Sequence, residues 1–292
     1  MDIDIRSTLK KFNLRPTKSL GQNYLIDNNI LMGIVEASEL TREDLVLEIG
    51  PGLGSLTTEL AESAGMVVAV EIDKRLIPVL NHNLKEFSNI KIINGDIMKF
   101  NVVEELSKIV TANGGDFSTA SLKIVANLPY YITTPVVMKF LESSIDAKTM
   151  VFMVQKEVAD RMVAKPGTKD YGALSVAVQY YSKASVIIEV PPQSFIPQPD
   201  VYSSVVKLEI YKTPPVDLHD QELFFRVVKA AFGQRRKTLV NAMNNAGYFN
   251  INKEELKEII ISKGIDENQR GETLSIVQFA QISNSIFEKK HS

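Results

Sequence analysis

The four residues Asn127-Leu128-Pro129-Tyr130 combine the groups that a planar base with an exocyclic amine requires. They follow the apolar run Leu122–Ala126, which is typical of a buried strand. Pro129 has no N–H to donate to a sheet, so we expect the strand to end there. The Asn127 carboxamide and the freed Leu128 carbonyl would accept hydrogen bonds from the two amine hydrogens, and the Tyr130 ring would stack on the base. Taken alone, four such residues are equally consistent with a strand end and a proline turn.

A glycine loop and two acidic residues follow other expected strands. Gly50-Pro51-Gly52-Leu53-Gly54 comes directly before a helix, where bare backbone can approach a ligand closely. Glu71 ends the next strand and could accept from both ribose hydroxyls, and Asp96 ends the third and could accept from an adenine amine.

The ligand that these groups favour is S-adenosylmethionine. The spacing is G-x-G-x-G rather than the G-x-G-x-x-G of dinucleotide sites. The acidic surroundings also suit the sulfonium cation of this cofactor better than the pyrophosphate of NAD. Each residue by itself would be typical of a tight turn or a solvated strand end.

These strand ends belong to a series in which strands and helices alternate. Alternation of this kind predicts an α/β fold with a parallel sheet that helices cover on both faces. We expect strands over residues 45–49, 66–70, 90–93, 122–126 and 150–154, and helices over residues 55–64, 75–87, 101–110 and 134–143.

The second half of the chain changes character. Segments 173–181, 185–190 and 203–211 look strand-like with little helix between them, which predicts antiparallel additions at the sheet edge. Thr213-Pro214-Pro215 then breaks the pattern, and the sequence is helical from Gln221 onward. We therefore expect a Rossmann-like domain over residues 1–212 and a smaller, all-helical domain over residues 213–292.

Composition sets the outer limits. The chain has 292 residues, 45% of them hydrophobic and 23% charged, as in ordinary globular proteins. It contains no cysteine, so we predict no disulfide and no thiolate metal site, and no metal is expected. The first residues lack an apolar signal core, and no apolar run approaches the ~20 residues that span a bilayer. We expect a cytoplasmic protein without membrane contact.

Nucleic-acid binding must come from local patches, because the net charge is −2. Residues 5–26 contain five basic residues and no acidic one, and residues 224–240 contain five more, again with no acidic one. Each cluster alone is more typical of a solvated face. Beside a site that handles a base, they predict phosphate contacts, especially at Arg235, Arg236 and Lys237.

Five separated motifs lie along the chain: Lys18–Leu25, Glu48–Gly54 with Glu71–Asp73, Ala126–Tyr131, Phe195–Ser203 and Ala231–Leu239. They resemble those of the ribosomal RNA adenine dimethyltransferases, in particular their bacterial KsgA type. The resemblance extends over nearly the whole chain. Tyr24 stands where the family usually has Phe, a conservative change that adds a hydroxyl, and Tyr202 stands where Asp is common and touches no catalytic role.

This resemblance implies a role for each site residue. Asn127, Leu128, Pro129 and Tyr130 would form the catalytic motif, with Phe195 stacking on the target adenine opposite Tyr130. The S-adenosylmethionine site would comprise Asn23, Leu25, Gly50, Gly52, Glu71, Ile72, Asp96 and Asn127.

The resemblance also implies a substrate. It predicts a monomer that dimethylates the exocyclic amines of two adjacent adenosines in a 3′-terminal hairpin loop of 16S rRNA, linked to biogenesis of the small subunit. Two alternatives stay open. The related macrolide-resistance methylases act on 23S rRNA, but they tend to have Asn-Ile-Pro-Tyr and lack the Gln234–Leu239 signature. An RNA-binding assembly factor whose methylation is incidental is the other, although the intact Asn127–Tyr130 motif indicates retained activity.

Overall fold

A computed structural model describes residues 3–143 and 145–291, and it divides the chain into two compact units. The first comprises residues 1–159 and 184–210, and the second comprises residues 160–183 and 211–292. The second unit therefore resumes near the boundary expected from the Thr213–Pro215 break, and it also takes in residues 160–183, which the sequence had placed in the first domain.

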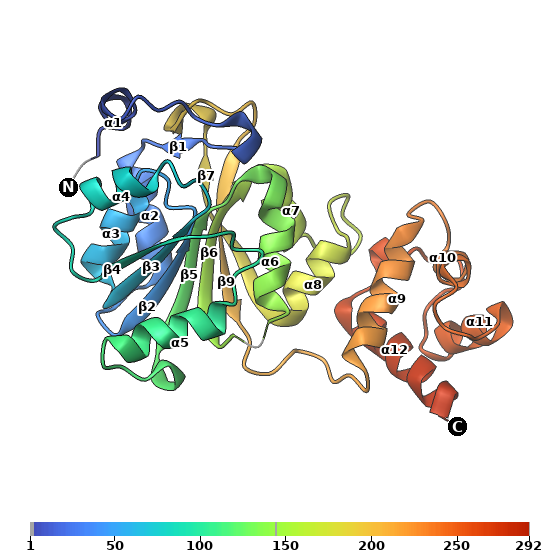
Figure 1. Cartoon of the computed structure of the whole chain (residues 1–292). Helices are drawn as coiled ribbons and strands as arrows, with labels where there is room; N and C mark the ends of the chain where they lie inside the picture. The colour runs from blue at the N-terminus through green and yellow to red at the C-terminus, as the bar shows by residue number, and fades with distance from the viewer. Residues whose placement is uncertain (1–2, 144, 292) are drawn as a thin grey trace. The chain divides into compact units, whose positions relative to one another are not determined.

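The first unit is built on one seven-stranded sheet, whose strands run through the centre of the unit in Figure 1. The strand order is β4-β3-β2-β5-β6-β9-β7; the first five strands are parallel, and β9 runs antiparallel to β6. The expected α/β architecture with a sheet-edge addition is thus confirmed. The strands are β2 (Asp44–Ile49), β3 (Met66–Glu71), β4 (Ile90–Asn94), β5 (Ser121–Asn127), β6 (Ala147–Gln155), β7 (Ser182–Val190) and β9 (Ser203–Ile210).

A separate two-stranded sheet joins the N-terminal segment to the loop before β9. It pairs β1 (Tyr24–Leu25) with β8 (Phe195–Ile196) in antiparallel register. The helices of this unit are α1 (Ile5–Lys11), α2 (Asn28–Ser38), α3 (Ser55–Ser63), α4 (Ile77–Asn83), α5 (Val102–Ala112), α6 (Thr133–Leu141) and α7 (Lys156–Val163), the last of which continues into the second unit.

The central strand β2 shows why the sheet needs cover on both faces. Every residue of β2 is buried, as are five consecutive residues of β5, from Leu122 to Ala126. A continuous apolar strand of this kind is stable only between two layers, because side chains alternate between the two faces of a sheet.

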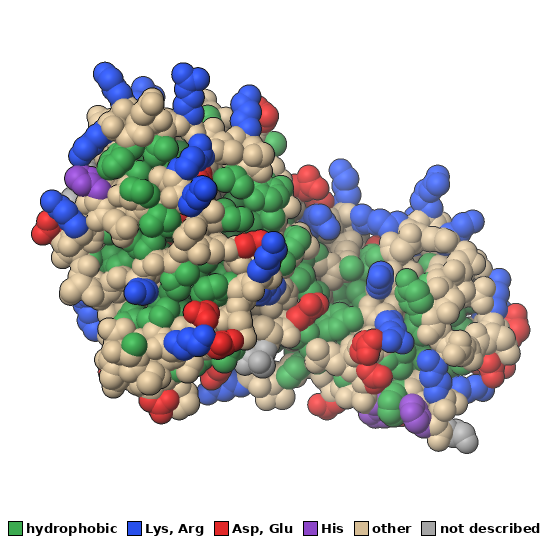
Figure 2. Space-filling model, in the orientation of Figure 1, with side chains coloured by type: hydrophobic (Ala, Val, Ile, Leu, Met, Phe, Trp, Pro, Cys, Tyr) green, Lys and Arg blue, Asp and Glu red, His purple; other side chains and the backbone are tan. Residues whose placement is uncertain are grey.

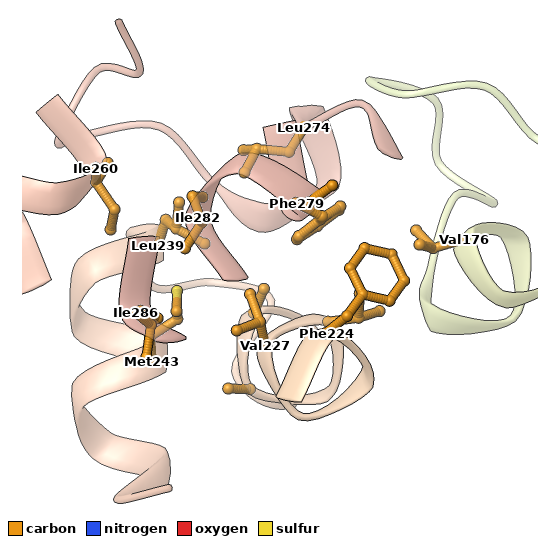
Figure 3. Close-up of a cluster of buried hydrophobic side chains, with 14 of the residues drawn as sticks. Val176, Phe224, Val227, Leu239, Met243, Ile260, Leu274, Phe279, Ile282 and Ile286 are labelled. Carbon is orange, nitrogen blue, oxygen red and sulfur yellow. The ribbon is translucent and has the colours of Figure 1, made fainter. Parts of the chain in front are cut away.

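The second unit is built on helices and has its own core (Figure 1). Figure 3 shows the Phe224 ring between Phe279 and Val176, and Val176 points toward it from a different helix. The helices are α8 (Ala173–Tyr181), α9 (Gln221–Gly233), α10 (Leu239–Ala246), α11 (Lys253–Ser262) and α12 (Ile276–His291).

The predicted strand over residues 173–181 was wrong, because this segment is helix α8. Its apolar residues recur so densely that alternation suggested a strand. In the structure Leu174, Val176, Val178 and Tyr180 are all buried, so the helix is apolar on more than one side. The predicted helix over 75–87 also shortens to α4, which begins at Ile77 with a proline in its first turn, where proline is tolerated.

No helix in the described part of the chain is long and apolar enough to cross a membrane.

Candidate cofactor and base-binding site

Neighbouring strand ends build the site. Because β3, β2 and β5 are adjacent and parallel, their carboxyl ends meet at one edge of the sheet. This is the edge where open α/β sheets bind ligands. A cavity lies there, and these predicted site residues line it: Asn23, Leu25, Gly50, Gly52, Glu71, Ile72, Asn127, Leu128, Pro129 and Tyr130.

Glu71 is fixed at the end of β3 by two backbone donors. Its Oε2 accepts from the Gly52 N–H at 3.2 Å, and its Oε1 accepts from the Asp73 N–H at 2.8 Å. Burial raises the pKa of this carboxyl group, and the two hydrogen bonds partly oppose that rise. Each oxygen keeps a lone pair, so the carboxylate can still accept from a ligand hydroxyl.

The glycine loop fits a ligand against bare backbone. Gly50 and Gly52 have φ values of +70° and +61°, which glycine adopts without the strain of other residues. A Cβ on Gly50 would meet no atom within 4 Å, so this residue presents open space to the cavity that it lines. A Cβ on Gly52 would lie 3.2 Å from the Tyr24 ring.

Glu48 is a site residue that the sequence interpretation missed. It is buried, it lines the cavity, and its Oε2 has no hydrogen-bond partner among the described residues. Burial raises its pKa to about 8, and the charge of Glu71 adds to that rise. A buried carboxyl oxygen without a partner is costly unless a ligand satisfies it, and a cation would do so. An acidic residue within the otherwise apolar run 45–49 was the available signal.

The site fits the cationic, ribose-bearing cofactor expected from the sequence. The Glu48 oxygen lacks a partner among the described residues, Gly50 has open space beside it, and the Glu71 carboxylate is held in place by backbone hydrogen bonds.

The amide of Asn127 is oriented by the N-terminal segment. Its Nδ2 donates to the Asn23 carbonyl at 3.2 Å, which leaves Oδ1 as the acceptor. The Leu128 N–H donates to the Met153 carbonyl at 3.0 Å, whereas no described residue donates to the Leu128 carbonyl. The two acceptors predicted for an exocyclic amine are therefore available at the end of β5.

Tyr130 is held at the same place by a link to β9. Its hydroxyl lies 2.8 Å from Ser203 Oγ, and burial raises the pKa of the phenol, so it stays neutral. The ring is part-buried and lines the cavity.

The Phe195 ring is buried in this structure. Its side chain is only 1% exposed and packs in the core with Leu25 and Val205. Its stacking on the target adenine stays a prediction. The Phe195 backbone in β8 pairs with Leu25 in β1.

Asp96 is also absent from the described lining of the cavity. Its Oδ1 accepts from the Met98 N–H at 2.9 Å and stabilises the turn after β4. The contact with an adenine amine stays a prediction.

The predicted basic cluster divides into two kinds of residue. Arg235 Nη2 donates to the carbonyls of Lys169 and Tyr171 at 2.8 and 3.2 Å and lies 3.4 Å from a Glu272 carboxylate oxygen. Arg235 therefore holds the 169–171 segment within its unit. Arg236 and Lys237 lie in the exposed loop between α9 and α10 and have no ion pair among the described residues.

Comparison with known proteins now decides the family. The model of the family "Ribosomal RNA adenine dimethylase" matches residues 13–288. The chain belongs to the ribosomal RNA adenine dimethylase family. The resemblance inferred from the five motifs is thereby confirmed, as is the expectation of a methyltransferase.

Curated relatives of this dimethylase are similar along nearly their whole length. The chain is 48% identical to ribosomal RNA small subunit methyltransferase A of Alkaliphilus oremlandii, covering 97% of this chain and 96% of the relative. It is 49% identical to the protein of the same name from Clostridioides difficile, over 98% and 96%.

Solved structures share the fold of this dimethylase. A dimethyladenosine transferase from Plasmodium falciparum superposes with a TM-score of 0.76 at 25% identity, covering 91% of this chain and 98% of that one. A 23S rRNA methyltransferase superposes with a TM-score of 0.68 at 24% identity, over 91% and 100%, which shows the fold alone.

Proposed function

We propose that this chain uses S-adenosylmethionine to dimethylate the exocyclic amines of two adjacent adenosines in the 3′-terminal hairpin loop of 16S rRNA. The observation that carries the proposal is the pair of acceptors at the end of β5, where Asn127 is oriented by the Asn23 carbonyl and the Leu128 carbonyl is unpaired. The names of the curated relatives support the small subunit as the substrate.

The cofactor would be held by residues from three strand ends. Glu71 would accept hydrogen bonds from the ribose hydroxyls. Gly50 and Gly52 would lie against the methionine and ribose portions of the cofactor. Ile72, which is 49% exposed, would contact its adenine. Glu48 would face a positive charge of the ligand. When bound, S-adenosylmethionine supplies an electrophilic methyl group on a cationic sulfur.

The residues at the end of β5 would orient the acceptor nitrogen. An adenine amine is a poor nucleophile because its lone pair is delocalised into the ring. Hydrogen bonds from both N–H groups to Asn127 Oδ1 and the Leu128 carbonyl favour a tetrahedral nitrogen, whose lone pair then points out of the ring plane. No general base is required beforehand, since the nitrogen becomes acidic once it is alkylated.

The target base must leave its stack, which costs a few kcal/mol. The Tyr130 ring would recover part of that cost by stacking on one face of the base. Phe195, whose ring is buried in this structure, would stack on the opposite face.

Docking to RNA would use exposed cations of the second unit. Arg236 and Lys237 have no acidic partner among the described residues and are available to phosphates. Arg235 would act by holding the neighbouring segment in place rather than by direct contact. The chain would act as a monomer on small subunits in the cytoplasm.

The test is the substitution Asn127→Ala. It removes one of the two acceptors and should lower kcat by two to three orders of magnitude, the size of effect seen when one oriented polar group is lost from a transition state. Affinity for small subunits should stay unchanged. The assay is mass spectrometry of rRNA after incubation with unmethylated small subunits and labelled cofactor. Wild-type turnover in this variant would remove the proposal.

The same assay separates the alternatives. Labelling of large-subunit rRNA would favour the 23S activity, against which Leu128 and the Gln234–Leu239 signature argue. Tight subunit binding without methylation of either RNA would favour an assembly factor.

A further inference from the structure

Residues 17–25 form a cap on the cofactor cavity. Within this N-terminal cap, Leu20 through Leu25 all line the cavity. The cap is tied down at its far end by the β1–β8 pair and by the hydrogen bond from Asn127 to the Asn23 carbonyl. The cap is a part of the lining that belongs to no strand of the main sheet, so it can move without disturbing the sheet.

The near end of the cap is held by Asp73. This carboxylate is 5% exposed and accepts four hydrogen bonds. Three come from Arg75, through its backbone N–H at 3.1 Å, Nε at 2.9 Å and Nη2 at 2.5 Å. The fourth comes from Gln22 Nε2 in the cap at 3.0 Å. Arg75 Nη2 also donates to Thr17 Oγ1, so both ends of the 17–22 segment meet this one pair.

Gln22 uses its other amide atom within the cap. Its Oε1 accepts from the Thr17 N–H at 2.7 Å and from the Tyr24 hydroxyl at 3.2 Å. The Gln22 side chain therefore makes hydrogen bonds within the cap through Oε1 and binds the cap to Asp73 through Nε2.

Asp73, which holds the cap, and Glu71, the proposed acceptor for the ribose, lie in the same turn of the backbone. The Asp73 N–H donates to Glu71 Oε1, while Glu71 Oε2 receives the Gly52 N–H. A ligand hydroxyl on Glu71 therefore acts two residues from the carboxylate that holds the cap.

We propose that Gln22, Asp73 and Arg75 form a latch that closes the N-terminal cap over the bound cofactor, and that ribose binding at Glu71 favours closure. This inference depends on the proposed function, in which the cavity binds S-adenosylmethionine. Gln22, Asp73 and Arg75 would be positioning residues, which act through the cap and do not touch the reacting atoms. The latch sets how tightly and how long the cofactor is held. At saturating cofactor the cap stays closed, so the Asn23 carbonyl still orients Asn127 and the methyl-transfer step is unchanged.

Gln22→Glu tests the latch with the smallest change that the chain allows. The new side chain keeps an oxygen for Thr17 and Tyr24 but replaces the donor that faces Asp73 by a carboxylate oxygen. Losing a hydrogen bond to a charged group should weaken S-adenosylmethionine binding by about tenfold or more in calorimetry. The KM for the cofactor should rise by a similar factor, while kcat at saturation should change less than about twofold.

A readout without turnover follows the cap directly. In the wild type, S-adenosylmethionine should slow hydrogen exchange of residues 17–25, and Gln22→Glu should lose most of that protection. Gln281→Glu, on the exposed face of α12, is the matched control with the same change in charge.

Two results would overturn the latch. Wild-type affinity and cap protection in Gln22→Glu would show that the Gln22–Asp73 bond does not hold the cofactor. A lowered melting temperature without selective exposure of the cap would make Gln22 a general stabilising residue. Failure of the wild type to bind the cofactor would instead overturn the proposed function, and the coupling with it.

Discussion

Three glycines with nearly the same backbone geometry allow the fit of the glycine loop to its ligand to be measured. Gly50, Gly52 and Gly247 have φ values of +70°, +61° and +68°. Gly50 and Gly52 line the cavity, whereas Gly247 ends helix α10 in the second unit. Alanine at each position costs about 1–2 kcal/mol, because an L residue is strained in the left-handed region.

Space around the added methyl group separates the three variants. A Cβ on Gly247 or Gly50 would meet no atom within 4 Å, so Gly247→Ala and Gly50→Ala should lose only that backbone cost. A Cβ on Gly52 would lie 3.2 Å from two atoms of the Tyr24 ring. Tyr24 is buried, so relieving this contact should add roughly 1 kcal/mol to the destabilisation.

Cofactor binding should follow a different order. Gly50→Ala places a methyl group into the open cavity and should weaken S-adenosylmethionine at least tenfold, whereas Gly247→Ala should bind normally. Urea unfolding gives the stabilities and calorimetry gives the affinities. Equal cofactor affinity in Gly50→Ala and Gly247→Ala, with both variants folded, would refute the argument that the ligand lies against the bare backbone of Gly50.

Further predictions concern charge, the aromatic ring and RNA docking. Because the folded pKa of Glu48 is raised from 4.5 to about 8, its stabilising effect is complete below pH 4.5 and is lost as the pH rises through 8. Glu48→Gln should therefore flatten the decline of thermal stability over this interval, and a decline as steep as in the wild type would contradict the assignment. Tyr130→Phe loses the hydroxyl bond to β9 and should cost about 1 kcal/mol of stability while keeping most methyl transfer, since the ring is retained; loss of activity equal to that of an alanine variant would argue against stacking as its role. Neutralising Arg236 and Lys237 together should lower the slope of log affinity for small subunits against log salt by about two, with cofactor affinity unchanged. Arg235→Ala should mainly lower the melting temperature, because its guanidinium holds backbone carbonyls; a changed salt slope with normal stability would reverse this assignment.

The sequence predicted the site well where a residue type marks the end of a strand. Pro129 marks the end of β5, and Glu71 the end of β3, so both could be placed at one sheet edge from the parallel pattern alone. Once the strand ends are aligned, the parallel register brings Gly50, Glu71 and Asn127 together, and the structure shows them around one cavity.

The errors have physical causes. In segment 173–181 apolar residues are so dense that periods of 2 and 3.6 residues fit equally, and only tertiary packing distinguishes helix from strand. Glu48 was missed because burial creates its altered pKa, and burial cannot be seen in a strand pattern that is apolar on both faces.

The discontinuous second unit has a consequence for the order in which the chain is made and folds. Helix α8 leaves the ribosome about forty residues before α9, yet its buried side chains, such as Val176 and Tyr180, pack in the same core as Phe224. Until the tail has been synthesised, α8 has no covering layer and is an exposed apolar helix, the kind of surface that chaperones bind and that aggregates. A chain cut at residue 212 would carry this defect permanently. We therefore expect the tail to be needed for the solubility of the residues before it, and deleting it would be a poor test of RNA binding.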